Sequence, residues 1–477
     1  AVIEATASSP RVAQGDTLAV TVSAMRRRPA PLLVLGFSGP DGVLMLELEQ
    51  LPWNRPLTAE FAYAVAPTQA IDQPYWLAAP HTTLYRPDSA QYSGIEPASR
   101  SSSVFRGELR VSDGADLSAE RGLMQTWVDR VAGERTRPVV ITPVGSIEVE
   151  DAVALVPGER AQVSVEVQAL CDDLSGKLEA TAPAGWSIDH VSQPVEKLRR
   201  GERARLSIEL RRTKLAQAGT LHFSFAGPKG SSDRTMHVID YPHILPQTWY
   251  TPADVMLVPA EVAVSIRTVG YIDGAGDDVP KALQRLGLAV ERIDPASAHP
   301  SDLEKCDAIV TGIRAYNTVL ALARFQPTLL AYVENGGTLL VQYNTSGGDL
   351  VLDAKKIGPY PFTLTRDRVT VEEAAATFLA PAHALMNVPN KLGPADFEGW
   401  VQERGLYFTG EQDSRYTALI AWNDPGEKPT NGALISCDYG KGRFVYTGIS
   451  LFRQLPAGVP GAYRLLANLL SRRAPRE

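Results

Sequence analysis

Cysteine is scarce in this sequence, which has only Cys171, Cys306 and Cys437 among 477 residues. Three thiols with no CxxC spacing are too few for a disulfide framework. Cys171 also falls in a different predicted domain from the other two. We therefore expect three buried or half-buried thiols, and cysteine usage leaves the cellular compartment open.

The chain also lacks long apolar runs and a positive net charge. No run reaches the length of a membrane span and no N-terminal hydrophobic region is visible, so we predict no transmembrane segment. The net charge of −7 and the pI near 5.7 argue against a general affinity for nucleic acid or anionic membranes. Because the chain begins with Ala1 rather than Met, we expect a signal peptide or a whole domain upstream.

The length of 477 residues predicts two to four domains rather than one core. Apolar and polar residues alternate in the first half, between turns rich in Pro and Gly, which is typical of β-sandwiches. We predict a β-sandwich at 1–112, a connector with a short helix at 113–138 and an immunoglobulin-like β-sandwich at 139–240. A linker that packs rather than moves freely follows at 241–260, and residues 82–103 read as a surface loop.

The remaining part, residues 261–477, has a different pattern. Three short apolar runs, at 265–272, 308–313 and 338–343, alternate with two helix-like segments. This order predicts a parallel sheet, and therefore a three-layer α/β domain of the flavodoxin-like or class I glutamine amidotransferase-like kind. Ligands of such sheets bind outside the carboxyl ends of the strands, where the polar turns of this sequence lie.

The first of these turns resembles a nucleotide-binding loop only in part. Residues 273–278 read Asp-Gly-Ala-Gly-Asp-Asp, and Asp294 follows at the distance that a dinucleotide-binding fingerprint requires. However, the third glycine of that fingerprint is replaced by Val279. The two aspartates at the end of the turn would also repel phosphates from the helix N-terminus. We interpret the turn as a tight connection with an acidic helix cap.

The residues needed for nucleophilic catalysis are missing from their expected places. An amidotransferase-like sheet would carry a Gly-x-Cys-x-Gly elbow after the third run and a histidine late in the chain. Residues 340–345 read Leu-Val-Gln-Tyr-Asn-Thr, with Tyr343 roughly where the thiol would be. The late strand ends Tyr-Thr-Gly-Ile-Ser at 446–450, without a histidine. We therefore assign no catalytic residue.

Metal-binding residues do not converge either. The seven histidines are scattered over all regions, whereas a zinc site needs three converging ligands. His299 begins the sequence His-Pro-Ser-Asp, which is similar to a His-Pro-Asp-Asp metal motif but has Ser301 in place of the second ligand position. We assign no metal ligand and expect no cofactor in this chain.

The acidic stretch at 396–404 has two interpretations. Paired carboxylates beside an aromatic side chain are what a glycoside hydrolase uses, and Trp400 could stack on a sugar ring. The same residues also occur in solvated loops and salt-bridged helix ends. Both interpretations stay open, with the structural one favoured.

Five runs resemble the C-terminal half of large bacterial PIG-L (LmbE-like) family proteins: 270–278, 312–317, 342–345, 396–405 and 452–456. The region around Gly185 and Trp186 is similar to the NPCBM-associated sandwich. The resemblance implies a secreted or periplasmic protein with β-sandwich modules and a C-terminal domain similar to trehalose-utilisation and glutamine amidotransferase-like folds. It also implies a zinc-dependent deacetylase domain that this chain does not contain.

From the resemblance we expect a non-catalytic accessory region that recognises or positions a glycan for a deacetylase domain, upstream or on a separate chain. A hydrolase acting on an acylated or glycosidic substrate in the α/β crevice is one alternative, and a purely structural module is another. Whether the chain is an enzyme thus stays open. The side chains that we expect to bind the ligand are Asp273, Asp277, Arg314, Tyr316, Asn317, Gln342, Tyr343, Asn344 and Trp400.

Overall fold

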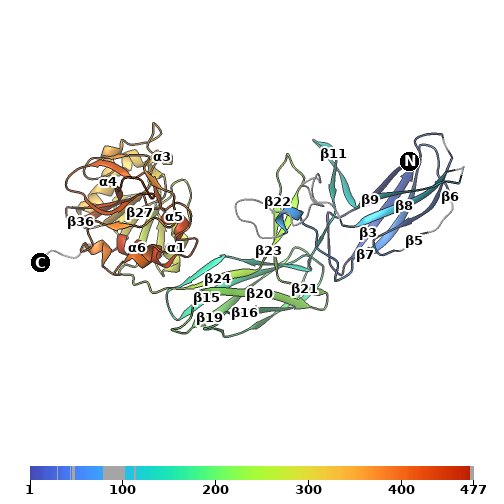
Figure 1. Cartoon of the computed structure of the whole chain (residues 1–477), viewed down its shortest axis with the longest axis horizontal. Helices are drawn as coiled ribbons and strands as arrows, with labels where there is room; N and C mark the ends of the chain where they lie inside the picture. Colours follow the sequence, from blue (N-terminus) through green and yellow to red (C-terminus); the bar gives the residue numbers. More distant parts are fainter. Residues whose placement is uncertain (30, 43, 46–48, 79–101, 112–113, 473–477) are drawn as a thin grey trace. The chain divides into compact units, whose positions relative to one another are not determined.

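The computed structural model describes residues 1–29, 31–42, 44–45, 49–78, 102–111 and 114–472. Most of the regular structure is β-sheet, divided among several separate sheets (Figure 1). The chain forms two compact units, so it is multidomain. The first unit comprises Ala1–Ala152, Arg160–Leu215 and Gly219–Met256, and the second comprises Val153–Glu159, Ala216–Ala218 and Leu257–Glu477.

The first part of unit 1 contains two sheets around one apolar core. The sheets have the strand orders β11-β10-β1-β3-β7 and β5-β4-β8-β9. Strand β3 buries every second side chain, which fits a sheet with one covered face. The strands are β1 (Val2–Ala7), β2 (Arg11–Ala13), β3 (Thr17–Met25), β4 (Leu32–Ser38), β5 (Leu44–Met45), β6 (Glu49–Gln50), β7 (Pro56–Ala64), β8 (Val104–Val111), β9 (Asp116–Gly122), β10 (Met124–Asp129) and β11 (Gly133–Pro138), with a 3₁₀ turn η1 (Tyr75–Leu77).

The short helix expected within residues 113–138 is wrong, because this segment forms strands β9, β10 and β11. Strand β9 pairs with β8, and β10 pairs with both β1 and β11. Hydrogen bonds to β1 and β8 stabilise β10 and β9, and no local sequence pattern predicts these pairings. A local signal does exist at the β10–β11 turn, where the Asp129 carboxylate accepts from the backbone of Val131 and Ala132. The surface loop predicted at 82–103 lies almost wholly outside the described residues.

The second part of unit 1 also contains two sheets with alternating burial. One has the order β13-β15-β19-β17, and the other includes the run β24-β20-β16-β18. The predicted linker at 241–260 contains β23 and β24, both paired in sheets. Strand β14 (Val153–Val156) and the end of β24, from Leu257, belong to unit 2. The other strands are β12 (Val140–Thr142), β13 (Gly145–Val149), β15 (Arg160–Ala169), β16 (Leu174–Thr181), β17 (Trp186–Ile188), β18 (Ser192–Leu198), β19 (Arg203–Arg212), β20 (Gly219–Gly227), β21 (Gly230–Ser232), β22 (Arg234–Ile239), β23 (Gln247–Pro252) and β24 (Asp254–Pro259).

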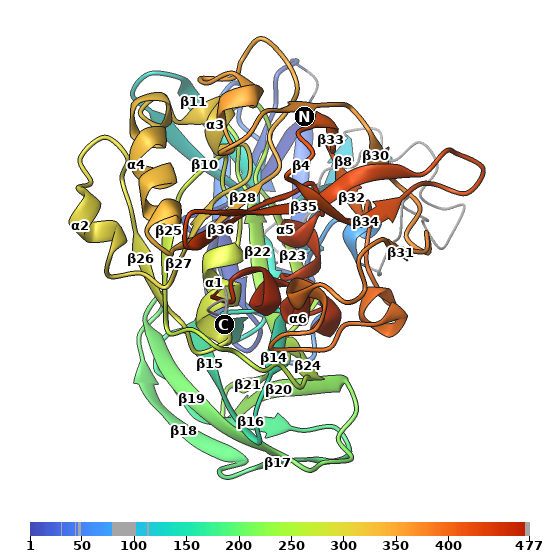
Figure 2. The ribbon, with the colours of Figure 1, turned by 90° about the vertical axis from the view of Figure 1, so that its left-hand side faces the viewer.

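Most of unit 2 is an α/β domain built on one eight-stranded sheet (Figure 2). Its order is β26-β25-β27-β28-β36-β35-β34-β31, parallel from β26 to β36 and antiparallel beyond. The three apolar runs form β25, β27 and β28, as predicted. The strands of this sheet are β25 (Thr268–Ile272), β26 (Ala289–Arg292), β27 (Ala308–Thr311), β28 (Thr338–Gln342), β31 (Thr377–Phe378), β34 (Thr417–Trp422), β35 (Thr430–Tyr439) and β36 (Gly442–Thr447).

Helices cover both faces of this sheet. On β28, Leu340 packs in the same apolar cluster as residues of α1, α5 and α6, whereas Leu339 and Val341 pack in the cluster of α3 and α4. Double coverage explains why β28 has no exposed side chain. The helices are α1 (Val279–Arg285), α2 (Pro300–Leu303), α3 (Ala315–Thr318), α4 (Leu322–Glu334), α5 (Leu451–Gln454) and α6 (Pro460–Leu469).

A long excursion between β28 and β34 adds short strands and turns to the α/β domain. Strand β29 pairs with β33, and β30 pairs with β32. A backbone bridge joins Gly405 to Ile449, so the excursion reaches the segment that follows β36. These elements are β29 (Phe362–Leu364), β30 (Arg368–Val369), β32 (Gly405–Leu406), β33 (Thr409–Gln412), η3 (Ala354–Lys356), η4 (Ala384–Met386) and η5 (Pro394–Phe397).

Candidate functional site

Four strands of the α/β sheet end at one edge. Because β25, β27, β28 and β36 are parallel neighbours, the segments at 273–278, 312–317, 343–348 and 448–453 all follow carboxyl ends. Open α/β sheets bind ligands at this edge, beside the point where the strand order reverses. In this sheet the order reverses between β25 and β27.

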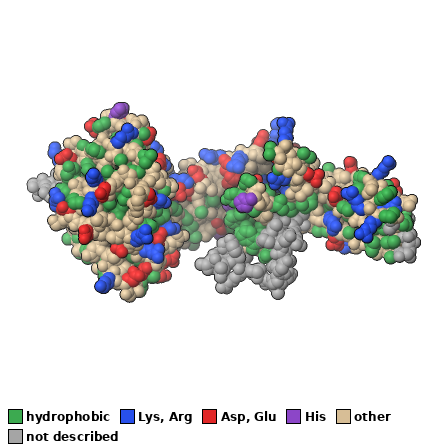
Figure 3. Space-filling view, turned by 90° about the horizontal axis from the view of Figure 1, so that it is seen from above, with side chains coloured by type: hydrophobic (Ala, Val, Ile, Leu, Met, Phe, Trp, Pro, Cys, Tyr) green, Lys and Arg blue, Asp and Glu red, His purple; other side chains and the backbone are tan. Residues whose placement is uncertain are grey.

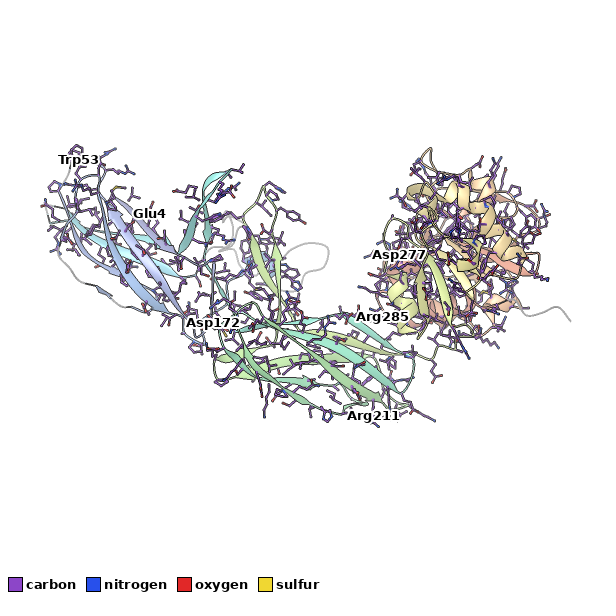
Figure 4. All side chains as sticks on the ribbon, turned by 180° about the vertical axis from the view of Figure 1, so that it is seen from behind. Glu4, Trp53, Asp172, Arg211, Asp277 and Arg285 are labelled. Atoms are coloured by element: carbon purple, nitrogen blue, oxygen red, sulfur yellow. The ribbon has the colours of Figure 1, made fainter. Side chains whose placement is uncertain are left out.

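Asp277 lies in the turn after β25, beside the point where the strand order reverses. Its carboxylate accepts a hydrogen bond of 2.5 Å from the Tyr271 hydroxyl and bonds of 3.0 Å from the backbone N–H groups of Val279 and Ile313. In Figure 4, Asp277 lies on the yellow-green part of the chain that contains β25 and α1. The turn after β25 is pressed onto the turn after β27, since a Cβ atom on Gly274 would lie 2.1 Å from the Ile313 carbonyl oxygen. Asp277 therefore holds two turns together.

Asp273 lies at the same edge but is exposed and ion-paired. Its carboxylate accepts from Arg292 on β26, and the Arg292 guanidinium lies 5.1 Å from the centre of the Tyr271 ring. Both side chains are more than half exposed. Asp273 is thus accessible, on the β26 side of the sheet.

Three more of the predicted binding residues belong to the core. Tyr316 is fully buried and donates a 2.5 Å hydrogen bond to the Gln326 side chain. Asn344, also fully buried, accepts from the backbone of Tyr316 at 2.8 Å. Gln342 is 2% exposed and donates weakly, at 3.4 Å, to the Tyr271 hydroxyl and to the Thr311 carbonyl. These three buried side chains hold the turns in place through their hydrogen bonds, and their ligand-binding roles stay predictions.

Asn317 has a similar positioning role, although it is only partly buried. Its amide donates to the Thr345 carbonyl at 3.3 Å and accepts from the Thr345 N–H at 3.0 Å. The pair ties the turn after β27 to the turn after β28.

Arg314 and Tyr343 are the remaining polar side chains near the middle of this edge, and the Arg314 side chain is 40% exposed whereas Tyr343 is 7% exposed. Arg314 has left-handed backbone geometry, with φ of 56°, and its N–H donates to the Tyr343 carbonyl at 2.8 Å. The guanidinium is 3.9 Å from Asp349, and its Nε has no hydrogen-bond partner among the described residues. A non-glycine residue in this conformation is strained by about 1 kcal/mol and often marks a functional position.

Tyr343 is surrounded by aromatic and charged side chains that the sequence did not single out. Its ring centre lies 6.1 Å from that of Tyr407, in a nearly parallel stack, and 5.3 Å from that of Phe452. Arg453 donates to Glu403 at 2.7 Å. We call Arg314, Tyr343, Glu403, Tyr407, Phe452 and Arg453 the carboxyl-edge cluster.

Burial and the charged side chains of this cluster together shift the pKa of the Tyr343 hydroxyl. Burial raises the pKa of Tyr343, and the nearby Arg314 and Arg453 partly oppose that shift. Glu403 acts in the same direction as burial. Tyr343 is therefore a neutral hydroxyl group near pH 7 rather than a phenolate.

Backbone strain is also concentrated near this cluster. Left-handed φ angles occur at Arg314, at Tyr407 (52°) and at Gln402 (55°), whose side chain accepts from Arg453. In the sequence, residues 402–404 belong to the acidic stretch, 402–405 and 452–453 belong to runs of the family resemblance, and Tyr407 belongs to neither. No periodicity or motif could have placed them beside Tyr343, because they reach it from the excursion and from the segment after β36.

Trp400 cannot act as a sugar-stacking platform. It is 3% exposed and stacks against Phe397 at 5.3 Å, and its indole N–H donates to the Asp396 carbonyl at 2.8 Å. The neighbouring carboxylates are ion-paired, Asp396 with Arg464 at 2.7 Å and Glu403 with Arg453. The stacking role predicted for Trp400 is wrong, and the pairing favours the structural interpretation of this stretch.

The three thiols are buried, as predicted. Burial raises the pKa of all three, and that of Cys437 rises to about 12. A thiol with such a pKa is protonated near pH 7 and is a poor nucleophile. Over the described ranges, no group of three or more His, Cys, Asp or Glu residues could hold a metal ion. Likewise, no helix in that part of the chain is long and apolar enough to cross a membrane.

Comparisons with known proteins give only distant similarity. No protein-family profile matches this chain, and no curated protein matches it. Similar solved structures include a β-galactosidase from Rahnella sp. R3 (18% identity, 44% of this chain and 32% of the other, TM-score 0.26). Others are a putative GMP synthase protein from Thermoplasma acidophilum (9%, 44% and 94%, 0.27) and an exo-β-1,4-mannosidase from Opitutaceae bacterium strain TAV5 (13%, 44% and 37%, 0.28). The chain spans about a third of the length of the two glycosidases, and these TM-scores support no argument about its function.

Proposed function

We propose that this chain is a non-catalytic accessory region of a PIG-L-type N-deacetylase and that its α/β domain recognises a glycan, in a secreted or periplasmic setting. We also propose that the two strand-rich parts of unit 1 are immunoglobulin-like sandwiches. The parallel part of the α/β sheet has the order β26-β25-β27-β28-β36, equivalent to 2-1-3-4-5, which is the flavodoxin-like order.

The observation that carries the glycan proposal is the carboxyl-edge cluster. Sugars present hydroxyl groups around a ring whose C–H faces are apolar. Tyr407 and Phe452, which are partly exposed and pack against the buried Tyr343 ring, offer aromatic surface for such faces, while the partly exposed Arg314 has a buried Nε–H group without a partner among the described residues. The Tyr343 hydroxyl also makes no hydrogen bond within the described part of the chain, and can therefore donate to or accept from a sugar hydroxyl.

The same groups are poorly suited to hydrolysis. A tyrosine base or nucleophile needs a lowered pKa, whereas burial raises the pKa of Tyr343. Glu403 is held by Arg453, so its charge is already compensated. The groups of this site therefore suit the binding of a glycan better than its hydrolysis.

The test is calorimetric titration of the whole chain with millimolar hexoses, N-acetylhexosamines and their short oligomers. We expect Arg314→Ala and Tyr343→Ala each to weaken binding of the best ligand by at least about tenfold, the loss of one charge-assisted hydrogen bond or one aromatic contact. Arg324→Ala, an exposed arginine on α4, is the matched control and should leave affinity unchanged.

Two results would contradict the proposal. If no sugar binds in a way that Arg314→Ala weakens, the carboxyl-edge cluster is not a glycan site. If the purified chain itself turns over an acylated or glycosidic substrate, with zinc supplied, the non-catalytic part of the proposal is wrong.

A further inference from the structure

Apart from the carboxyl-edge cluster, the α/β domain has a cavity that contains a buried cation without an ion-pair partner among the described residues. The cavity has a volume of about 490 Å³, within the range of small-molecule sites. Loop 401–404 separates it from the carboxyl-edge cluster: the backbone N–H of Gln402 donates to Glu372 of the cavity, while the Gln402 side chain accepts from Arg453. The cavity is lined by Glu372, Glu373, Ala374, Ala375, Ala376, Pro394, Phe397, Glu398, Gly399, Trp400 and Arg404.

Arg404 is the buried cation. It is 4% exposed, and among the described residues the only hydrogen bond of its side chain runs from Nη1 to the Phe397 carbonyl, at 2.5 Å. The guanidinium lies 5.8 Å from the Trp400 ring centre and 5.5 Å from that of Trp422. Its Nε is buried without a partner in the described part of the chain. Because a buried donor without an acceptor is costly, this group points to an acceptor that a ligand would bring.

Carboxylates determine the net charge of the residues that line the cavity. Glu372, Glu373 and Glu398 all line it and are exposed, whereas Arg404 is the single cation in the lining. The lining is therefore net negative, and it favours a cationic ligand over an anionic one. Burial lowers the pKa of Arg404, and the two nearer carboxylates, Glu373 and Glu372, oppose that shift. These two are close enough to act on the same bound molecule as Arg404.

The remaining wall is apolar and leaves room for a ring. Phe397 and Trp400 line it but are only 4% and 3% exposed, so a ring would pack mainly against the alanines at 374–376, of which Ala375 is exposed. Small side chains at three adjacent positions leave space where larger ones would fill the cavity. A ring with an apolar C–H face would remove this wall from water.

We propose that this cavity binds an amino sugar, namely one hexosamine unit whose amine is protonated. The ammonium group would pair with Glu373 and Glu398, and ring hydroxyl oxygens would accept from Arg404. A sugar acid would be repelled by the three carboxylates, and a simple polyamine would leave Arg404 without an acceptor. The site is distinct from the carboxyl-edge cluster and does not depend on it.

The test compares D-glucosamine with D-glucose, N-acetyl-D-glucosamine and D-glucuronate by calorimetric or NMR titration of the whole chain. At about pH 6.5 an amine with a pKa near 8 is mainly protonated. We expect glucosamine to bind at least about tenfold more tightly than glucose or its N-acetyl derivative, and glucuronate not to bind. The preference for glucosamine should fall as salt is added, because exposed carboxylates are screened.

Two variants locate the site. Glu373→Gln should weaken glucosamine binding by about fivefold or more and leave glucose binding unchanged, whereas Glu304→Gln, an exposed control after α2, should change neither. Arg404→Lys keeps the charge but removes the planar fork, so it should weaken glucosamine binding in any preparation whose circular dichroism is unchanged. If that variant does not fold, Glu373→Gln decides alone.

Equal affinity for glucosamine and glucose, or no effect of Glu373→Gln, would overturn the proposal. A loss of glucosamine binding on Arg314→Ala with none on Glu373→Gln would do so as well, since it would place the amino sugar at the carboxyl-edge cluster. Conversely, loss on Glu373→Gln alone supports this cavity even if the carboxyl-edge cluster binds no sugar.

Discussion

Strands β4 and β28 bury their side chains in different ways. In β4 of unit 1, Leu32 is 8% exposed and the next residue, Leu33, is 36% exposed. In β28 of the α/β domain, the consecutive residues Leu339 and Leu340 are both fully buried. The sheet that contains β4 is covered on one face, whereas the α/β sheet is covered on both faces at β28. The contribution of a leucine in β4 to the free energy of unfolding therefore depends on the face of the sheet from which its side chain projects. A leucine in β28 contributes on either face.

The same difference explains where each region can accommodate chemistry. Strands β27, β28 and β36 in the middle of the α/β sheet are fully packed, so the candidate polar side chains lie where the strands end. Gln342, Tyr343 and Asn344 are buried there, whereas Asp273 and Arg314 reach accessible positions. Charged side chains of both signs are interspersed over the α/β domain at the left of Figure 3. The side chains of this domain that could contact a ligand are therefore those in the turns and cavities.

The largest test of the comparison is a set of four leucine-to-alanine changes. Leu339→Ala and Leu340→Ala should each destabilise the α/β domain by about 3 kcal/mol, because each leaves a cavity. Leu32→Ala should have a comparable effect on unit 1, whereas Leu33→Ala should cost under about 1 kcal/mol. Scanning calorimetry, with the two units followed as separate transitions, measures each cost. A small cost at either β28 position would mean that its face is not packed as described.

A second test concerns the two aspartates of the first turn. Asp277→Ala should destabilise the α/β domain by about 3 kcal/mol, because it leaves the buried Tyr271 hydroxyl and the N–H groups of Val279 and Ile313 without an acceptor. Asp273→Ala removes only an exposed ion pair with Arg292 and should cost under about 1 kcal/mol. Denaturant unfolding distinguishes them. Equal costs would contradict the role of Asp277 in holding the two turns together.

A third test separates strain from binding at Arg314. Arg314→Gly should be more stable than Arg314→Ala by about 1 kcal/mol, since glycine adopts a φ of 56° without a Cβ penalty and alanine does not. Both variants should lose sugar affinity to the same extent. Thermal unfolding and titration of the two proteins give both numbers. If alanine is the more stable residue here, the left-handed geometry is not strained.

The smallest expected effect is the pH dependence of unit 1. His237 stacks on Trp249 with ring centres 4.4 Å apart, and burial lowers its pKa. A lowered folded-state pKa favours the neutral form, so this contribution to stability is complete above the unfolded pKa of about 6.5 and is lost as pH falls through the folded value. His237→Phe should flatten the stability profile of unit 1 in that window.

The control for this prediction is His190→Phe, at an exposed position, which should leave the slope unchanged. The α/β domain contains its own half-buried histidine, His383, and partial burial also lowers the pKa of this side chain. In the His237→Phe protein, the α/β domain should therefore still lose stability as the pH falls, as measured by its own unfolding transition. A flattened slope in both units would mean that His237 is not the responsible group.

The periodic pattern predicted the strands of both regions well and the connections poorly. Apolar and polar residues alternate in Thr17–Ser23 and in parts of Leu32–Phe37 and Leu57–Val65, and these runs form β3, β4 and β7. Residues 114–138 are mostly exposed and polar, so they have no apolar period, and their strand form depends on neighbours distant in sequence. The domain boundaries stay a prediction.

The site was only partly predictable for the same reason. The rule that ligands bind at carboxyl ends led to Arg314 and Tyr343, but it could not tell that Tyr316 and Asn344 turn into the core. It also could not find Tyr407, which reaches Tyr343 from another part of the chain. The ligand-binding roles of all nine candidate residues stay predictions, except the stacking role of Trp400, which its burial contradicts.

The sequence by itself determined that β25, β27 and β28 are short buried strands, because a continuous apolar run between polar turns can be satisfied only by a sheet covered on both faces. It also determined the acidic turn before α1. Only the tertiary structure decided which side chains around those turns remain accessible. Burial depends on what packs against a residue, and at this edge the packing partners come from the excursion and from the segment after β36, whose approach no local pattern encodes.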